Sequence, residues 1–154
     1  MFENIFLCIV IHKYKDTLQM EKGYVESCVG IVEIEYQDNT IYSCVFINHP
    51  LPDNCKIQDI HYYEGYNVSM NGTPFQTLVW EEILNIPQGK TVTYSEIAEK
   101  IGKPNAHRAV ANACGQNKIA IFIPCHRVVG KGNMGGYKWG IERKKKLLQV
   151  EKAS

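Results

Sequence analysis

The spacing of apolar residues changes once along this chain, across the polar segment 66–72, and no other feature constrains the fold as strongly. Before it, the runs 6–12, 28–36 and 40–47 are continuously apolar or alternate between apolar and polar residues. These runs predict three strands, the last two paired as an antiparallel hairpin. A weaker pattern over 54–66 is compatible with a short helix. We expect segment 66–72 to be a linker.

After this linker the signals are those of helices. The segments 73–76 and 93–96 each place a threonine three residues before Gln or Glu, which is the capping-box pattern of a helix start. A third helix, rich in alanine, is predicted over 106–114. The second and third helices are joined by a tight turn at 103–105 and form a helix-turn-helix candidate. A helical hairpin that binds nothing is the alternative interpretation.

Charge is divided unevenly between the two halves. Residues 1–72 carry a net charge of −6 and residues 73–154 a net charge of +7, within a total of +1. A basic half suits contact with a polyanion such as nucleic acid, and chance segregation is the alternative. The change in apolar spacing, from strand-like before the linker to helical after it, predicts an α/β (α+β) fold. We expect an N-terminal α/β domain at 1–68 with an antiparallel sheet, and a C-terminal helical domain at 73–154.

A candidate nucleophile lies in the second half. The run 119–123 is continuously apolar, which predicts a buried strand, and it leads into the segment Pro124–Val128 (PCHRV). Neighbouring basic groups lower the pKa of a thiol, so Cys125 beside His126 and Arg127 is a candidate thiolate. The alternative is a buried structural cysteine next to a surface His-Arg pair.

Membrane, secreted and zinc-finger proteins are disfavoured. No apolar run approaches the roughly 20 residues that span a bilayer. The first four residues lack the basic region of a secretory signal, so we expect a cytoplasmic protein without a membrane partner. The six cysteines include no CxxC pair and no Cys/His pair at zinc-finger spacing. We expect no metal and no cofactor, with a zinc site of N-terminal Cys and His as the open alternative.

Several short motifs follow one another in the second half. They are Phe75-Gln76, Val79-Trp80, IPxGxTxTY from Ile86 to Tyr94, IAxxIGxP from Ile97 to Pro104, Arg108-Ala109-Val110, Asn117, PCHRV at 124–128, Gly135-Gly136-Tyr137, and LLQVE at 147–151. In this order, over about residues 72–151, the chain resembles the O6-alkylguanine-DNA alkyltransferases. The resemblance implies a small RNase H-like N-terminal domain and a C-terminal domain with a winged-helix-like helix-turn-helix. Residues 1–65 are compatible with that family but carry no diagnostic motif.

The resemblance implies a catalytic role for five residues. Cys125 would attack the alkyl carbon on guanine O6, and His126 would take the thiol proton through a water. Glu151 would orient His126 and compensate its charge. Tyr94 would protonate or hydrogen-bond the departing base, and Asn117 would bridge the recognition helix and the active-site turn. The thioether product has no easy hydrolysis route, so the protein would act once.

The resemblance also implies how DNA would be held. The partner would be double-stranded DNA carrying O6-alkylguanine, and possible substrates include O4-alkylthymine. The target nucleotide would be flipped out, with Arg108 filling the vacated stack. Positions matching DNA contacts of the family are Ala106, Ala109, Ala111, Gln76, Ser95, Lys103 and Lys131. Gly132 to Lys138 would form the loop around the guanine, and the substrate pocket would include Val128, Met134, Gly135, Gly136, Tyr137 and Lys138. We expect a monomer without an obligate protein partner, and Lys144–Lys146 on the solvated face of the last helix.

Three positions depart from the family pattern. The family usually has Asn-Pro at Asn117-Lys118, often has a second Ala where this chain has His107, and has a Gly where this chain has Ala111. All lie at or beside the expected DNA-facing surface and bear on lesion preference. Two other functions stay open, namely a binder of alkylated DNA that transfers nothing and a cysteine hydrolase using Cys125, His126 and Glu151.

Overall fold

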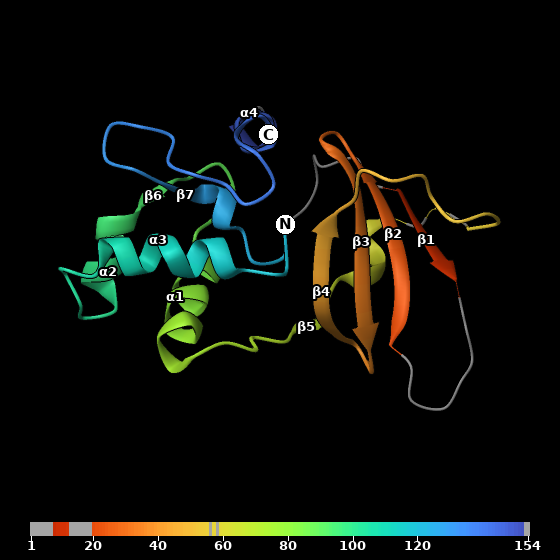
Figure 1. Ribbon diagram of the computed structural model, residues 1–154, viewed down its shortest axis with the longest axis horizontal. Coiled ribbons are helices and arrows are strands. Elements are labelled where there is room, and N and C mark those ends of the chain that lie inside the picture. Colours follow the sequence, from red (N-terminus) through yellow and green to blue (C-terminus); the bar gives the residue numbers. More distant parts are fainter. Residues whose placement is uncertain (1–7, 13–19, 56, 58, 153–154) are drawn as a thin grey trace.

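The computed structural model describes residues 8–12, 20–55, 57 and 59–152, and Figure 1 shows a sheet on one side of the molecule and most helices on the other. The sheet has five strands in the order β1-β2-β3-β4-β5. These are β1 (Cys8–His12), β2 (Glu21–Ser27), β3 (Gly30–Gln37), β4 (Thr40–Phe46) and β5 (Asn67–Val68). Neighbours from β1 to β4 are antiparallel, and β5 runs parallel to β4.

The β3–β4 hairpin follows the predicted alternation. Val32, Ile34 and Tyr36 are buried, while the glutamates between them are only half-buried. Asp38 and Asn39 form the turn with φ values of 48° and 58°. Two successive positive φ angles are typical of a type I′ turn, whose twist matches that of the flanking strands. The predicted hairpin is therefore confirmed.

Four features of the first half differ from the predictions. Strand β2 was not predicted, and β3 begins only at Gly30 because the Ser27 hydroxyl donates to the Gly30 carbonyl and closes a turn. The expected linker contributes β5, which is bonded to the edge of β4. Among the described residues of segment 54–66, the structure has only the 3₁₀ helix η1 (Ile60–Tyr63). Of the predicted strand 6–12, residues 6 and 7 lie outside the described residues.

The second half contains the predicted helices and three short elements. These are α1 (Pro74–Leu84), β6 (Val92–Thr93), α2 (Tyr94–Lys100), α3 (His107–Gln116), the 3₁₀ turn η2 (Cys125–Arg127), β7 (Val128–Val129) and α4 (Ile141–Lys152). Both capping boxes form, with Thr73 at the start of α1 and Thr93 at the start of α2. The α+β fold class, an N-terminal antiparallel sheet and C-terminal helices, is thus confirmed.

The apolar run 119–123 is not a strand, which corrects the sequence-based expectation. It makes a single bridge with β4, between Ile119 and Cys44, and then turns. Ile121 has a φ of 69°, a conformation that a β-branched residue rarely adopts. The turn forms because the Ile123 amide donates back to the Ile119 carbonyl at 3.1 Å. Burial of the run was predicted correctly, but its backbone follows local bonds that the apolar pattern does not encode.

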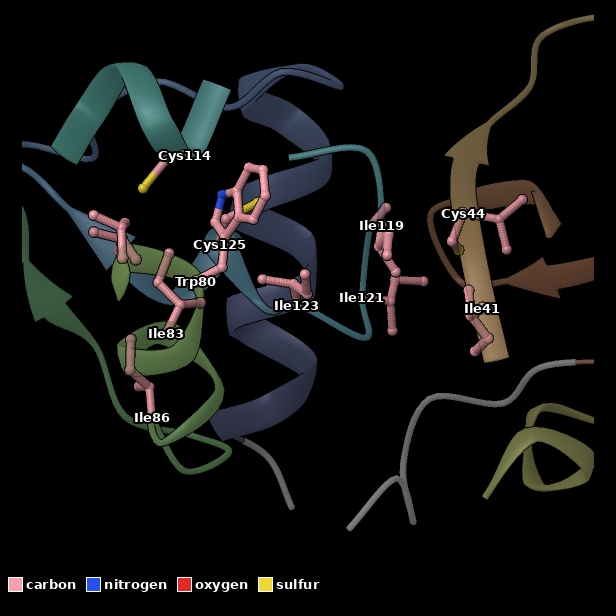
Figure 2. Packing of buried hydrophobic residues seen from close by; sticks show 14 of the residues in the cluster. Ile41, Cys44, Trp80, Ile83, Ile86, Cys114, Ile119, Ile121, Ile123 and Cys125 are labelled. Atoms are coloured by element: carbon pink, nitrogen blue, oxygen red, sulfur yellow. The ribbon is translucent and has the colours of Figure 1, made fainter. Parts of the chain in front are cut away.

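One hydrophobic cluster joins the two halves. Figure 2 shows Ile119 and Ile121 next to Ile41 and Cys44 of β4, with Trp80 and other residues of α1 farther away on the helical side. All of these residues are 5% exposed or less. The turn 119–123 therefore packs the helical half against the sheet.

The described residues contain neither a membrane-spanning helix nor a metal-binding cluster. No helix among them is long and apolar enough to cross a membrane. Within the same residues, no three His, Cys, Asp or Glu side chains form a group that could hold a metal ion.

Candidate active site

The parallel pairing of β6 with β7 brings two distant segments together. Val92 and Thr93 pair with Val128 and Val129, so Tyr94, directly after β6, lies near η2, directly before β7. Cys125 is the first residue of η2 and is 4% exposed. Two-residue strands thus position the two side chains that were predicted to face the substrate.

Cys125 and Tyr94 share a cavity of about 230 Å³. One wall is α3, and the opposite wall is the loop before α4. The lining residues are Tyr94, Ala111, Asn112, Cys114, Gly115, Cys125, Gly136, Tyr137 and Lys138. Asn112, Cys114 and Gly115 were missed by sequence reasoning, although they lie on the helix that was predicted to approach DNA.

Three residues predicted for the pocket do not line this cavity. Val128 is fully buried in β7, and Met134 is half-buried in the loop. Gly135 lies behind Tyr94 and has a φ of 66°. A Cβ atom at Gly135 would be only 2.7 Å from the Tyr94 hydroxyl, so a glycine is needed for this close approach.

The Asn117 side chain organises the turn that carries Cys125. Its Oδ1 accepts from the Ile119 amide at 2.8 Å, and its Nδ2 lies 3.3 Å from the Ile119 carbonyl and 3.0 Å from the Ile123 carbonyl. Nδ2 also donates to Cys125 Sγ at 3.2 Å. Because Asn117 is 1% exposed and follows α3 directly, it links this helix to the thiol.

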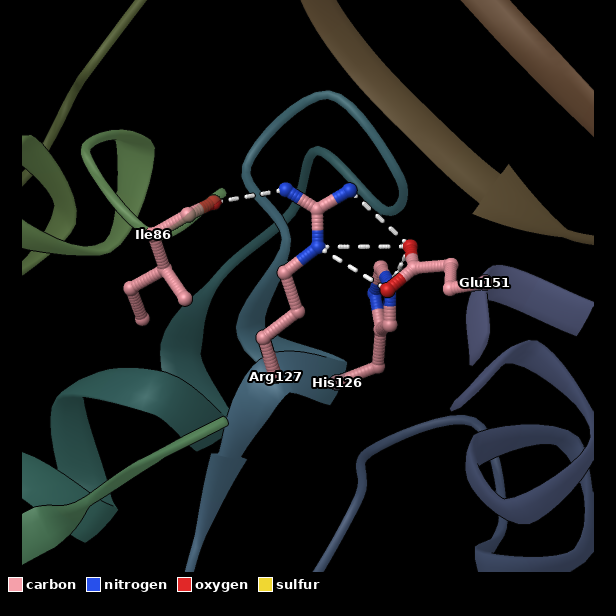
Figure 3. A network of polar contacts seen from close by, with 4 residues as sticks. All are labelled: Ile86, His126, Arg127 and Glu151. Atoms are coloured by element: carbon pink, nitrogen blue, oxygen red, sulfur yellow. Dashed lines mark hydrogen bonds and ion pairs between the residues drawn. The ribbon is translucent and has the colours of Figure 1, made fainter. Parts of the chain in front are cut away.

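His126 and Arg127 both bond to Glu151 of α4, as Figure 3 shows. His126 Nε2 lies 2.7 Å from Glu151 Oε1, and Arg127 Nε and Nη2 donate to the same carboxylate at 2.9–3.2 Å. Arg127 Nη1 donates to the Ile86 carbonyl at 2.7 Å. All three charged or polar side chains are buried, so the alternative of a surface His-Arg pair is wrong.

The electrostatics of Cys125 differ from the expected lowered pKa. Burial raises the pKa of the Cys125 thiol to about 11, while the Asn117 hydrogen bond and the Lys144 charge act in the opposite direction. Burial also lowers the pKa of His126, against the effect of its hydrogen bond to Glu151, and favours the neutral imidazole. The adjacent basic side chains, His126 and Arg127, are engaged with Glu151, so they do not offset the effect of burial on the pKa of Cys125.

Lys144 is fully buried, which contradicts its predicted place on a solvated face. Its Nζ donates to the Val128 carbonyl at 2.6 Å and to the Gly136 carbonyl at 2.9 Å. Burial lowers its pKa to about 8. Lys144 shares helical spacing with Leu147, Leu148 and Glu151, all inward-facing. That spacing was the signal that sequence reasoning missed.

Six of the eight residues predicted to touch DNA lie in the α2–turn–α3 unit, whereas Gln76 lies in α1 and Lys131 lies in the loop after β7. Arg108 and Ala109 are exposed on α3, and Ala106 and Ala111 are half-buried at its start and middle. The remaining four are Lys103 and Lys131, which are exposed, and Ser95 and Gln76, which are half-buried. The Gln76 side chain accepts from the Thr73 amide at 2.9 Å as part of the α1 capping box.

Comparisons with known proteins agree with this geometry. Residues 74–153 match the family model described as 6-O-methylguanine DNA methyltransferase, DNA binding domain. The chain is 49% identical over 145 residues to a probable methylated-DNA–protein-cysteine methyltransferase of Acanthamoeba polyphaga mimivirus, covering 86% of this chain and 97% of that protein. It is 54% identical over 85 residues to the Escherichia coli K12 bifunctional transcriptional activator/DNA repair enzyme Ada, covering 54% of this chain and 24% of Ada.

Solved structures show the same fold. The Mycobacterium tuberculosis O6-methylguanine methyltransferase has 32% identity and a TM-score of 0.70, with 84% of this chain and 91% of that chain covered. Mycobacterium tuberculosis OGT in complex with DNA has 34% identity and a TM-score of 0.71, with the same coverage. The similarity therefore includes the N-terminal sheet, where the sequence carries no diagnostic motif.

Proposed function

We propose, for a chain that belongs to the 6-O-methylguanine DNA methyltransferase family, that Cys125 takes the alkyl group from O6-alkylguanine in duplex DNA. The observation that carries this proposal is the position of the thiol. Cys125 Sγ lines a cavity of about 230 Å³, receives a hydrogen bond from Asn117, and adjoins a buried His126–Glu151 pair. This is the constellation that a buried nucleophile requires.

The thiol proton has a defined acceptor. Glu151, as a carboxylate, only accepts hydrogen bonds, so the His126 Nε2 that it contacts carries the proton and Nδ1 is the basic nitrogen. Nδ1 is buried and has no hydrogen-bond partner among the described residues. In the proposed step, the proton passes from Cys125 Sγ through a water to His126 Nδ1, and Glu151 stabilises the resulting imidazolium.

The transfer itself balances without a cofactor. The Cys125 thiolate forms a bond to the alkyl carbon while the bond from that carbon to guanine O6 breaks. The bonding electrons go to the guanine ring, which accepts a proton from the Tyr94 hydroxyl. The sulfur is left as a thioether, which is stable to water, so each molecule acts once.

The size of the cavity supports a proposal in which the base leaves the duplex. Pockets for drug-sized ligands have volumes of roughly 300–1,000 Å³, so about 230 Å³ suits one flat base and not a base pair. We propose that the nucleotide is flipped out and that exposed Arg108 fills the gap. We further propose that the protein acts as a monomer without an obligate partner and that O4-alkylthymine is a second substrate.

A non-catalytic binder of alkylated DNA is the second candidate function. It is favoured by the burial of Cys125 and by the raised pKa of its thiol, about 11, because a protonated thiol is a poor nucleophile. The hydrolase alternative has no comparable support. A hydrolase acting on an acyl group would need an oxyanion site, whereas transfer of an alkyl group to sulfur does not.

The experiment that separates these functions follows the alkyl group. The protein is incubated with a slight excess of duplex carrying O6-methylguanine, and the peptide containing Cys125 is weighed by mass spectrometry. We expect one methyl group per protein on Cys125 and the same amount of restored guanine, with no transfer to a Cys125→Ser variant. Binding without methyl loss supports the binder, and restored guanine beside an unmodified Cys125 refutes direct transfer.

A further inference from the structure

A single side chain bridges the two walls of the cavity. Lys138, in the loop before α4, extends its Nζ to the carbonyl of Asn117, which follows α3, at 3.0 Å. The same Nζ lies 5.5 Å from the centroid of the Trp139 ring, within the range of a cation–π contact. Lys138 lines the cavity together with four residues of α3, namely Ala111, Asn112, Cys114 and Gly115. The contact thus closes the rim between loop and helix.

A second lysine, Lys144, holds the base of the loop before α4 independently of the Lys138–Asn117 contact. Lys144 Nζ binds the carbonyls of Gly136 and Val128 from below and is fully buried. Lys138, in contrast, is exposed. The Lys138–Asn117 hydrogen bond is only partly buried, and a hydrogen bond within reach of water opens more easily than those of the fully buried Lys144 side chain. The rim is therefore able to open while the loop remains attached at its base.

We propose that Lys138 is a latch that limits the size of the alkyl group that reaches Cys125. The proposal rests on the proposed function, since it names the specificity of the same cavity. A methyl group adds little to the volume of guanine, so the base carrying it enters with the latch closed. A benzyl group adds a six-membered ring, which needs space between the loop and α3. That space is available only when the Lys138–Asn117 contact has opened.

The size of the effect follows from the contact that must be broken. A charge-assisted hydrogen bond that is partly exposed contributes about 1.4 kcal/mol, which corresponds to a factor of about ten in rate. Removal of the latch should therefore raise the rate of transfer of a bulky group relative to that of methyl by up to about tenfold. The loss of the Lys138 charge, which lowers the pKa of Cys125, slows both transfers alike, so the ratio of the two rates is the quantity that reports the latch.

The test compares two substrates in one duplex sequence, one with O6-methylguanine and one with O6-benzylguanine. The ratio of their alkylation rates at Cys125 cancels contacts with DNA that both substrates share. Lys138→Met keeps the aliphatic stem and removes the donor, and Lys138→Arg restores a donor. Lys145→Met is the matched control, because Lys145 is an exposed lysine of α4 whose ion pair is with Glu142. Hydrogen exchange of the amides of 132–139 provides a readout independent of activity.

We expect the benzyl-to-methyl ratio to rise about fivefold to tenfold in Lys138→Met, and to stay at the original value in Lys138→Arg and Lys145→Met. Amide exchange in 132–139 should be faster only in Lys138→Met. A ratio that does not rise in Lys138→Met overturns the latch. If the unchanged protein takes up neither alkyl group, the proposed function fails. In that case exchange alone judges the latch, and unchanged exchange in Lys138→Met rejects it.

Discussion

At the scale of single residues, two buried polar side chains hold most of the site. Asn117 satisfies four groups in one turn, including Cys125 Sγ. Glu151 satisfies both His126 and Arg127. Buried polar groups are costly when any partner is missing, so these two networks specify one arrangement of the turn and of η2. The same burial keeps Cys125 protonated at rest, which makes the acceptor at His126 necessary.

Acid should destabilise the protein through Glu151. Burial alone would raise the pKa of this carboxyl, but hydrogen bonds from His126 and Arg127 outweigh it and hold the pKa at about 2, against an ordinary value of 4.5. A carboxylate with a lowered pKa in the folded state stabilises the fold above pH 4.5, and this stabilisation is lost as the pH falls towards about 2. We expect Glu151 to account for a loss of about 3 kcal/mol in the free energy of unfolding.

Urea denaturation over that pH range measures this loss. The matched variant is Glu151→Gln, which should have a lower stability at neutral pH and a correspondingly flatter acid dependence. An acid dependence of the same steepness in both proteins would show that other carboxylates are responsible.

At the scale of elements, short helices and strands position side chains that are far apart in the sequence. Helix α2 has only seven residues, yet its first residue is Tyr94, and its start is fixed by the Thr93–Glu96 capping box. The pairing of β6 with β7 then sets Tyr94 beside Cys125. A local sequence signal therefore controls the position of a side chain in the cavity.

Loss of the α2 cap should reduce reaction more than stability. Thr93→Ala should lower the free energy of unfolding by about 1 kcal/mol, the usual value of an N-cap side chain. It should also slow alkylation of Cys125 by a free O6-benzylguanine base, because Tyr94 would lose its fixed position. Thr73→Ala is the control, since it removes the equivalent cap from α1, which carries no cavity residue. Equal rate losses in the two variants would contradict this link.

Helix α3 should matter mainly for duplex DNA. Arg108→Ala is expected to slow methyl transfer from duplex at least tenfold, since a filled stack offsets several kcal/mol of unstacking, as a rough estimate. It should leave alkylation by the free base within about twofold, because the free base is not stacked. Rates on the two substrates give the comparison. Parallel losses on both would argue against a stack-filling role and for a structural defect in α3.

At the scale of the whole molecule, the sheet and the helices share one core. The buried cluster runs without interruption from β2, β3 and β4 to α1, α3 and η2. Helix α4 adds a polar link, because Arg143 donates to the Val29 carbonyl and to Asn48 Oδ1 and lies 4.9 Å from the Phe46 ring centroid. We propose that the division into 1–68 and 73–154 separates structural parts that unfold together.

Removal of Arg143 should weaken the whole molecule. Arg143→Ala deletes contacts with two hairpins of the sheet and with Trp139, so we expect a loss of about 2 kcal/mol in the free energy of unfolding, within one cooperative transition. Transfer of methyl should also slow, since α4 carries Lys144 and Glu151. Amide hydrogen exchange of β2–β4 and of α1–α3 in urea reports the sheet and the helices separately. Two transitions in the unchanged protein would show that the halves fold independently.

Much of the fold could be predicted from the sequence because its signals are local. Alternation over 32–36, the Asp38-Asn39 turn and the threonine caps are each settled by residues within four positions of one another. The order of motifs from Phe75 to Glu151 then indicated the family, and the comparisons confirmed it. The sequence by itself thus determined the helix starts and the β3–β4 hairpin, and it singled out Cys125 as the candidate nucleophile.

Only the tertiary structure decided the pKa of Cys125 and the shape of the cavity that it lines. The turn at 119–123 depends on the Asn117 side chain. The burial of Lys144 depends on two carbonyl groups, in other segments, that accept hydrogen bonds from its ammonium group. The raised pKa of Cys125 follows from burial by residues far away in sequence. Desolvation and long-range hydrogen bonds arise only when distant segments meet, and no local pattern records them.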